Sequence, residues 1–112
     1  MSFKSKQFYE FADFRLDVSE KVLLRGAGLV QLTRKVFETL QVLVENAGHL
    51  LEKDELMQNL WQDRFVEENN LTSNIKLLRK ALGDNSGNSR FIETVPRRGY
   101  RFVADVRESA KE

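Results

Sequence analysis

The sequence of 112 residues contains no cysteine, one proline and one histidine. The lack of cysteine excludes disulfide bonds, thiolate metal sites and cysteine nucleophiles, and it is typical of proteins from reducing compartments. The lone histidine, His49, has no second histidine with which to bind a metal ion. No apolar run approaches the roughly 18 residues of a membrane-spanning helix. We therefore expect a cytoplasmic chain that makes no membrane contact and holds no metal ion.

Arrangements typical of catalysis are missing as well. The six glycines fall at predicted turns, so no glycine-rich loop is present to cradle a phosphate. Neighbouring acids such as Asp54 and Glu55 point apart on a helix and are not placed as a general acid and base. No cluster of nucleophile, base and orienting group is evident. We expect no enzyme activity, no cofactor and no small-molecule substrate.

The composition is that of a folded domain, because hydrophobic residues make up 41% of the chain and charged residues 31%. The length fits a single domain, and no internal repeat or low-complexity run divides it. We predict one domain over residues 8–106, with flexible tails at 1–7 and 107–112.

Positive charge is concentrated in one part of the chain. Residues 1–68 contain nine Lys or Arg against twelve Asp or Glu, a net charge of −3, whereas residues 69–103 contain seven against two, a net charge of +5. Such a block predicts one basic face, which favours a phosphate, a nucleic acid or an acidic surface as partner. The alternative is a basic surface that only aids solubility.

Two hydrophobic patterns follow one another along the chain. Up to about residue 30, apolar and polar residues alternate around turns at 19–21 and 26–28, which predicts three or four short antiparallel strands. From Thr33, a typical N-cap, apolar residues recur at helical spacing as far as Ala47, and Gly48 is placed to end the helix. A second helix is predicted over residues 53–61.

The third predicted helix, about residues 69–82, has two different faces. Its apolar residues recur at i, i+4, i+7 and i+11 and predict a stripe buried in the core: Leu71, Ile75, Leu78 and Leu82. The opposite face is polar and basic and carries no carboxylate: Asn69, Thr72, Ser73, Lys76, Leu77 and Lys80. Side chains of these types can reach base edges and phosphates when a helix lies in the major groove of DNA.

The segment ETVPRRGYRF, residues 93–102, predicts a hairpin with a cationic tip. Pro96 and Gly99 are placed as in a four-residue loop built on a type I turn, with a positive φ at the glycine. Tyr100 and Phe102 share one face of a strand and are expected to pack beneath the hairpin. A rigid tip with two arginines can enter a minor groove beside the helix.

These two elements supply the candidate DNA ligands, which are Asn69, Thr72, Ser73, Lys76, Lys80, Thr94, Arg97, Arg98 and Arg101. For Arg101, a carboxylate within the protein and a phosphate are equally suitable partners. Thr94 fits an ordinary strand position as well as a phosphate contact. Arg79 lies beside the apolar stripe, where we expect an intramolecular salt bridge.

Four segments in this order resemble the OmpR/PhoB-type winged-helix DNA-binding domain, especially that of CadC/ToxR-like one-component regulators. They are LTRKVFETLQVLVENAG (32–48), KDELMQNLW (53–61), NNLTSNIKLLRKALGD (69–84) and FIETVPRRGYRF (91–102). The resemblance implies an α+β fold, a winged helix-turn-helix with an N-terminal four-stranded antiparallel sheet, a three-helix core and a C-terminal β-hairpin wing.

The resemblance also implies sequence-specific binding of double-stranded DNA in transcriptional regulation, with helix 69–82 in the major groove and wing 91–103 at the minor groove or backbone. A head-to-tail dimer on DNA is typical of the family. The family's loop between the second and third helices contacts RNA polymerase, and here this loop comprises Gln62, Asp63, Arg64, Phe65, Val66 and Glu67. The alternative is a protein-interaction module on the same frame, with Leu77, Phe65 and Val66 as apolar contacts.

Overall fold

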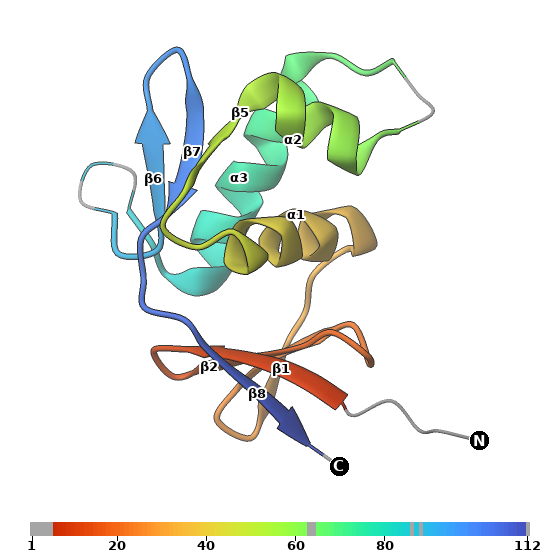
Figure 1. Ribbon diagram of the computed structural model, residues 1–112, viewed down its shortest axis with the longest axis vertical. Helices are drawn as coiled ribbons and strands as arrows, with labels where there is room; N and C mark the ends of the chain where they lie inside the picture. Colours follow the sequence, from red (N-terminus) through yellow and green to blue (C-terminus); the bar gives the residue numbers. More distant parts are fainter. Residues whose placement is uncertain (1–5, 63–64, 86, 88, 112) are drawn as a thin grey trace.

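The computed structural model describes residues 6–62, 65–85, 87 and 89–111. A five-stranded sheet lies across one end of the molecule, and three helices and a three-stranded sheet form the rest (Figure 1). In chain order the elements are β1 (Lys6–Phe11), β2 (Phe14–Asp17), β3 (Val22–Arg25), β4 (Gly28–Val30), α1 (Arg34–Glu45), β5 (Leu50–Glu52), α2 (Lys53–Leu60), α3 (Glu68–Leu82), β6 (Ile92–Val95), β7 (Gly99–Phe102) and β8 (Arg107–Lys111). The predicted α+β winged-helix architecture is confirmed.

The N-terminal sheet has one strand more than the four predicted. Its order is β4-β3-β2-β1-β8, and neighbouring strands are antiparallel. In the fifth strand, Arg107 pairs with Glu10 and Lys111 with Lys6, so residues 107–111 form an edge strand where a flexible tail was predicted. Residues 6 and 7, also assigned to a tail, belong to β1. The sequence of β8 is polar and did not predict a strand. The strand is held in place by backbone hydrogen bonds to β1, a distant segment of the chain.

Helix α1 begins where the sequence predicts. The Thr33 hydroxyl accepts a hydrogen bond from the Val36 N–H at 3.3 Å, an N-cap that typically contributes about 1 kcal/mol. The helix ends earlier than predicted, because Asn46 is its C-cap and the Asn46 side chain donates to the Val42 carbonyl at 2.8 Å. Gly48 has a φ of 87°, but it lies in the turn after the helix and is not the residue that ends it.

Helix α3 is oriented by its apolar stripe. Its four stripe residues are all buried, as predicted: Leu71, Ile75, Leu78 and Leu82. Burying each such side chain contributes roughly 1.5–3 kcal/mol relative to exposure. Beside the stripe, the Asn74 side chain donates a hydrogen bond to the hydroxyl of Thr39 on α1 at 3.2 Å. Because these contacts fix the rotation of the helix, they also determine which residues face outward.

The second sheet has the order β5-β7-β6, and its β6–β7 hairpin is the wing. The sequence did not predict β5, which places Leu51 opposite Tyr100 and Glu52 opposite Gly99. The two backbones approach so closely that a Cβ atom at Gly99 would overlap the Leu51 carbonyl oxygen and lie 2.9 Å from the Glu52 Cα. Gly99 is therefore needed because the two strands pack closely. The positive φ that was predicted for Gly99 is not found.

An aromatic cluster joins the wing to the N-terminal sheet. The Phe11 ring lies 5.1 Å from the Phe102 ring and 5.9 Å from the Phe91 ring, measured between centroids, and both pairs meet edge to face. Phe14 lies 5.7 Å from Phe91 in the same way. Such pairs add about 0.5–1.5 kcal/mol to the burial of the rings. Tyr100 and Phe102 are buried beneath the wing, as predicted.

Candidate nucleic-acid interface

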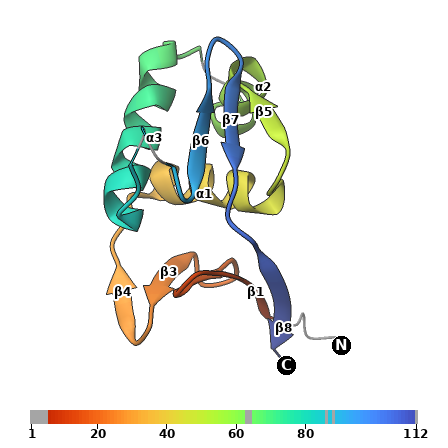
Figure 2. The same cartoon turned by 90° about the vertical axis from the view of Figure 1, so that its left-hand side faces the viewer.

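Helix α3 and the β6–β7 hairpin lie next to each other on one face of the molecule (Figure 2). A groove of about 470 Å³ runs between them, lined among others by Lys76 and Lys80 of α3 and by Tyr100 of β7. Arg79 bridges the two elements, because its side chain donates from α3 to oxygen atoms on β6. The two elements selected from the sequence thus form a single surface.

The outer face of α3 is open to solvent. Asn69, Thr72, Ser73, Lys76 and Lys80 are all exposed, as predicted, and Leu77 keeps 50% of its surface exposed. The Thr72 hydroxyl donates to the Glu68 carbonyl at 3.4 Å, so it offers lone pairs to solvent. Within the described part of the chain, neither Lys76 nor Lys80 has a carboxylate partner.

The wing tip differs from the predicted turn. The Arg98 N–H donates to the Val95 carbonyl at 3.0 Å, and Arg97 has a φ of 66°. A positive φ at the third residue, with Pro96 at the second, is the pattern of a type II turn, and the loop has three residues between the strands. For a residue with a side chain, such a φ costs about 1–3 kcal/mol. Arg97 is exposed and has no hydrogen bond or ion pair to any described residue.

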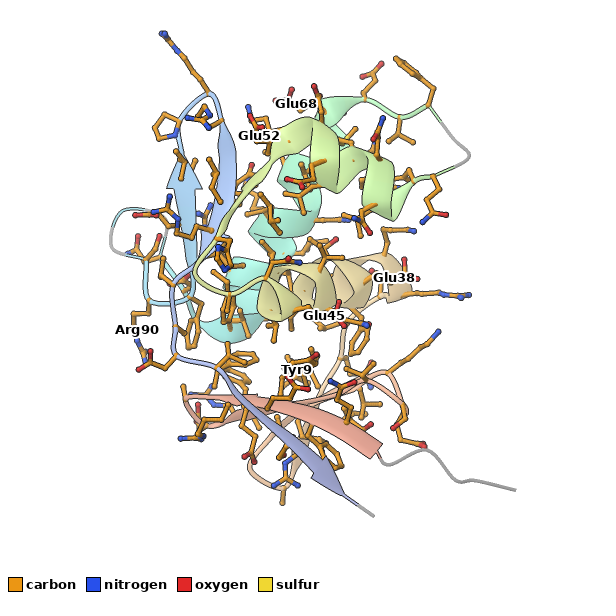
Figure 3. The ribbon with its side chains drawn as sticks, viewed as in Figure 1. Tyr9, Glu38, Glu45, Glu52, Glu68 and Arg90 are labelled. Atoms are coloured by element: carbon orange, nitrogen blue, oxygen red, sulfur yellow. The ribbon has the colours of Figure 1, made fainter. Side chains whose placement is uncertain are left out.

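The second arginine of the tip is tied to the start of α2. The Arg98 Nε lies 3.6 Å from a Glu52 carboxylate oxygen, and the Arg98 carbonyl accepts a hydrogen bond from the Lys53 N–H at 3.1 Å. The Lys53 ammonium lies 2.9 Å from Glu68 at the start of α3, and this carboxylate raises the pKa of Lys53. Both acids, Glu52 at the end of β5 and Glu68 at the start of α3, are labelled in Figure 3. Of the two tip arginines, only Arg97 is without a carboxylate partner among the described residues.

At the base of the wing, two arginines have partners inside the protein. Arg101 pairs with Glu93, the residue opposite it in the strand ladder, at 3.2 Å. Arg79 makes no salt bridge to a described residue, contrary to the prediction: its Nη2 donates to the Ile92 carbonyl at 2.8 Å and to the Thr94 hydroxyl at 2.7 Å. No sequence pattern indicates this contact, because it depends on where β6 packs against α3.

The loop between α2 and α3 presents a large apolar side chain to solvent. Phe65 is 99% exposed, Gln62 and Glu67 are exposed, and Val66 is partly buried. Phe65 helps to line a surface groove of about 740 Å³ over α2, together with Met57 and Trp61. The remaining two residues of the predicted polymerase loop, Asp63 and Arg64, lie outside the described residues.

Other kinds of site find no support in the described ranges. No three His, Cys, Asp or Glu side chains of residues 6–62, 65–85, 87 and 89–111 are grouped so that they could hold a metal ion. No described helix is long and apolar enough to cross a membrane. His49 is exposed in the turn after α1.

A three-helix core with a β-hairpin beside the third helix defines the winged-helix class of proteins. Residues 26–102 match the family model described as "Transcriptional regulatory protein, C terminal". The match covers more than half of the chain and includes α3 and the wing. The chain therefore belongs to this family of transcriptional regulatory proteins, and its resemblance to OmpR/PhoB-type domains is confirmed.

Curated relatives are regulators much longer than this chain. The transcriptional regulator HilA of Salmonella typhimurium is 36% identical over 102 residues, which cover 91% of this chain and 18% of HilA. The transcriptional activator CadC of Escherichia coli is 34% identical over 83 residues, which cover 73% of this chain and 16% of CadC. The chain thus spans less than a fifth of either relative.

Solved structures share the fold over nearly the whole chain. The DNA-binding domain of Escherichia coli CadC superposes with a TM-score of 0.79 at 28% identity, covering 92% of this chain and 97% of that domain. The DNA-binding domain of Klebsiella pneumoniae RstA, solved in complex with the RstA box, gives a TM-score of 0.76 at 28% identity, covering 86% and 96%.

Proposed function

We propose that this chain binds double-stranded DNA in a sequence-specific manner, as the DNA-binding part of a transcriptional regulator. The observation that carries the proposal is the face shared by α3 and the wing, where Lys76, Lys80 and Arg97 are exposed with no carboxylate partner among the described residues. Cations held on a rigid surface bind phosphates and release counterions from the duplex. The DNA complex of the RstA domain supports the same function.

The proposed DNA ligands form two groups, those that contact base edges and those that contact the sugar–phosphate backbone. In the major groove, α3 brings Asn69, Thr72 and Ser73 to base edges, while Lys76 and Lys80 bind phosphates. The wing places its tip in the adjacent minor groove or on the backbone. Its ligands are Thr94, Arg97, Arg98 and Arg101. Arg98 and Arg101 must exchange Glu52 and Glu93 for phosphates, so we expect a smaller contribution from them than from Arg97.

The salt dependence of duplex binding tests this function. Each neutralised phosphate releases about 0.9 counterion, so the three uncompensated cations predict a slope of about −3 on a log–log plot. If all five cations of the face took part, the slope would be about −4 to −5. Lys76→Ala should reduce the slope by about 0.9 and the affinity about tenfold, measured by fluorescence anisotropy on a duplex selected from a random pool.

Arg25→Ala is the matched control, because Arg25 is equally cationic but pairs with Asp13 on the N-terminal sheet. This variant should leave both slope and affinity unchanged. In the same selection, Ser73→Ala should alter the preferred base at one position of the site. A folded Lys76→Ala protein with the wild-type slope, or no preference for any selected duplex, would show that the proposal is wrong.

The α2–α3 loop supports a second, finer proposal, a contact with RNA polymerase. Phe65 is 99% exposed and lines one groove with Met57, Trp61 and Val66, and contiguous apolar side chains at a surface mark protein interaction sites. The same loop contributes Gln62 and Glu67, with Asp63 and Arg64 next to them in the sequence. Phe65→Ser should leave duplex affinity unchanged and weaken retention of purified polymerase on the protein–duplex complex. Undiminished retention would contradict the role of this loop.

Three further expectations stay predictions. A head-to-tail dimer on DNA predicts two chains for each duplex that carries a repeated half-site, which sedimentation of the complex measures. The absence of catalysis and the cytoplasmic location are expected from the sequence analysis, and membership of a family of transcriptional regulatory proteins supports both expectations.

A further inference from the structure

We infer that Arg79 is a positioning residue that directs the hydroxyl of Thr94 to donate a hydrogen bond to a phosphate of the bound duplex. The inference rests on the proposed function and adds a residue that neither the sequence nor the exposed charges identified. The Arg79 guanidinium connects α3 to the wing, because it donates to two oxygen atoms of β6.

The direction of this contact restricts what the hydroxyl can do. A threonine hydroxyl has one hydrogen to donate and two lone pairs that accept, whereas an arginine side chain only donates. Because the Thr94 Oγ1 accepts from the Arg79 Nη2 at 2.7 Å, its own hydrogen must point elsewhere. Thr94 is exposed, and its hydroxyl donates to no other group among the described residues. The hydrogen is thus available to an acceptor outside the protein.

The hydroxyl lies at the centre of the proposed interface. Thr94 stands opposite Tyr100 in the wing ladder and next to Val95, whose carbonyl closes the turn at the tip. Arg79 lies one helical turn from Lys76, and both residues line the groove between α3 and the wing. A sugar–phosphate backbone that passes from the α3 face to the wing tip crosses this position. The acceptor that suits a hydroxyl there is a phosphate oxygen.

Arg79 is less suited to bind the phosphate itself. Its side chain is half-buried, its Nε is buried without a hydrogen-bond partner among the described residues, and its Nη2 serves two acceptors on β6. A cation that donates to a hydroxyl polarises the O–H bond and strengthens the hydrogen bond that the hydroxyl donates. Arg79 therefore acts on DNA through Thr94.

A double-mutant cycle on duplex affinity tests the inference. Thr94→Val removes the hydroxyl at nearly constant shape and should weaken binding about fivefold, whereas Thr94→Ser, which keeps the hydroxyl, should restore most of the affinity lost in Thr94→Val. Arg79→Met should also weaken binding about fivefold, but less than twofold when Thr94 is already valine. Arg79→Lys, which keeps one donor, should recover part of the loss. Urea unfolding of each variant separates lost binding from lost stability.

Equal losses from Arg79→Met in the wild-type and Thr94→Val proteins would overturn the inference, because Arg79 would then act independently of the hydroxyl. A fall of about 0.9 in the salt slope of Arg79→Met would overturn it as well, since the guanidinium would itself neutralise a phosphate. Either result on a tightly bound duplex leaves the proposed function intact. Failure of the wild type to bind any duplex would instead refute the proposed function.

If Arg79→Met does not fold, duplexes with single uncharged methylphosphonate linkages decide the question. One linkage should weaken binding of the wild type and leave binding of Thr94→Val unaffected, because the valine no longer contacts that phosphate. Binding of Arg79→Lys should respond to the same linkage more weakly than binding of the wild type does, because its hydroxyl is less well positioned. Equal sensitivity of the wild type and Thr94→Val at every linkage would overturn the inference.

Discussion

The N-terminal sheet with α1 differs from the face shared by α3 and the wing in how exposed cations are paired with carboxylates. On the first, Arg25 lies 2.8 Å from Asp13, and Lys35 lies 2.7 Å from Glu38, where it lowers the pKa of that carboxyl group. On the second, Lys76, Lys80 and Arg97 have no such partner in the described residues. Both regions carry exposed positive charge, but Arg25 and Lys35 are held by carboxylates, whereas the three cations of the second face are not held by any described residue.

This difference bears on function more than on stability. Ion pairs between exposed side chains contribute about 0–1 kcal/mol, so the pairs around the N-terminal sheet stabilise the fold little. Each pair does cancel most of the field that its cation exerts at a distance. Unpaired cations keep that field and attract an anion from solution. The acids at the edge of the face, Glu52 and Glu68, are themselves paired with Arg98 and Lys53.

The largest effect is expected from Gly99→Ala, which separates the wing from β5. A Cβ atom at this position overlaps the Leu51 carbonyl, so the strands must move apart at a cost of about 2–3 kcal/mol. Gly28→Ala in the N-terminal sheet is the matched control, because the new Cβ atom there meets only the Arg25 carbonyl at an ordinary 3.5 Å. Urea unfolding measures both.

The control should change the free energy of unfolding by less than about 0.5 kcal/mol. Similar values for the two glycine variants would show that the wing does not depend on close contact with β5. The Gly99→Ala protein should also bind duplexes more weakly than Gly28→Ala at a temperature where both are folded, because its tip arginines are displaced.

A smaller effect on stability, with opposite sign, is expected from Arg97→Gly. Glycine adopts a φ of 66° without strain, so this variant should gain up to about 1 kcal/mol in the free energy of unfolding. It should at the same time bind duplex DNA about tenfold more weakly, because one phosphate contact is lost. Thermal unfolding and anisotropy titration measure the two quantities on the same sample.

Lys21→Gly provides the comparison in the N-terminal sheet, since Lys21 is also exposed and has a φ of 58°. It should gain stability in the same way and leave duplex affinity unchanged. If Lys21→Gly weakened binding as much as Arg97→Gly, the contrast between the two regions would be lost.

Features that depend on neighbouring residues could be predicted from the sequence. The i, i+4, i+7 spacing of Leu71, Ile75 and Leu78 determines the buried side of α3 and, with it, the exposed side that carries Lys76. The N-cap at Thr33 is equally local, because the side chain bonds to a backbone group three residues away. The candidate ligands on α3 were therefore found correctly as exposed residues.

Features that depend on distant segments could not be predicted. Strand β5 has three residues, too few for an alternating pattern, and it forms because β7 passes beside it. The turn at Arg97 follows from that pairing, since Gly99 is used for contact with β5 and the positive φ falls two residues earlier. The partners of Arg79 likewise lie on another element, so its link to Thr94 appears only when α3 and β6 are packed together.

Strand β8 returns the chain to the element where the described residues begin, with Lys111 opposite Lys6 in the ladder. Both strands lie at the end of the molecule remote from the wing tip (Figure 1). Because these two residues pair, a short linker from Lys111 to Lys6 would join β8 and β1 into one hairpin without disturbing either sheet. New ends could then be opened in a surface loop, giving a circularly permuted protein in which α3 and the wing keep their relative placement.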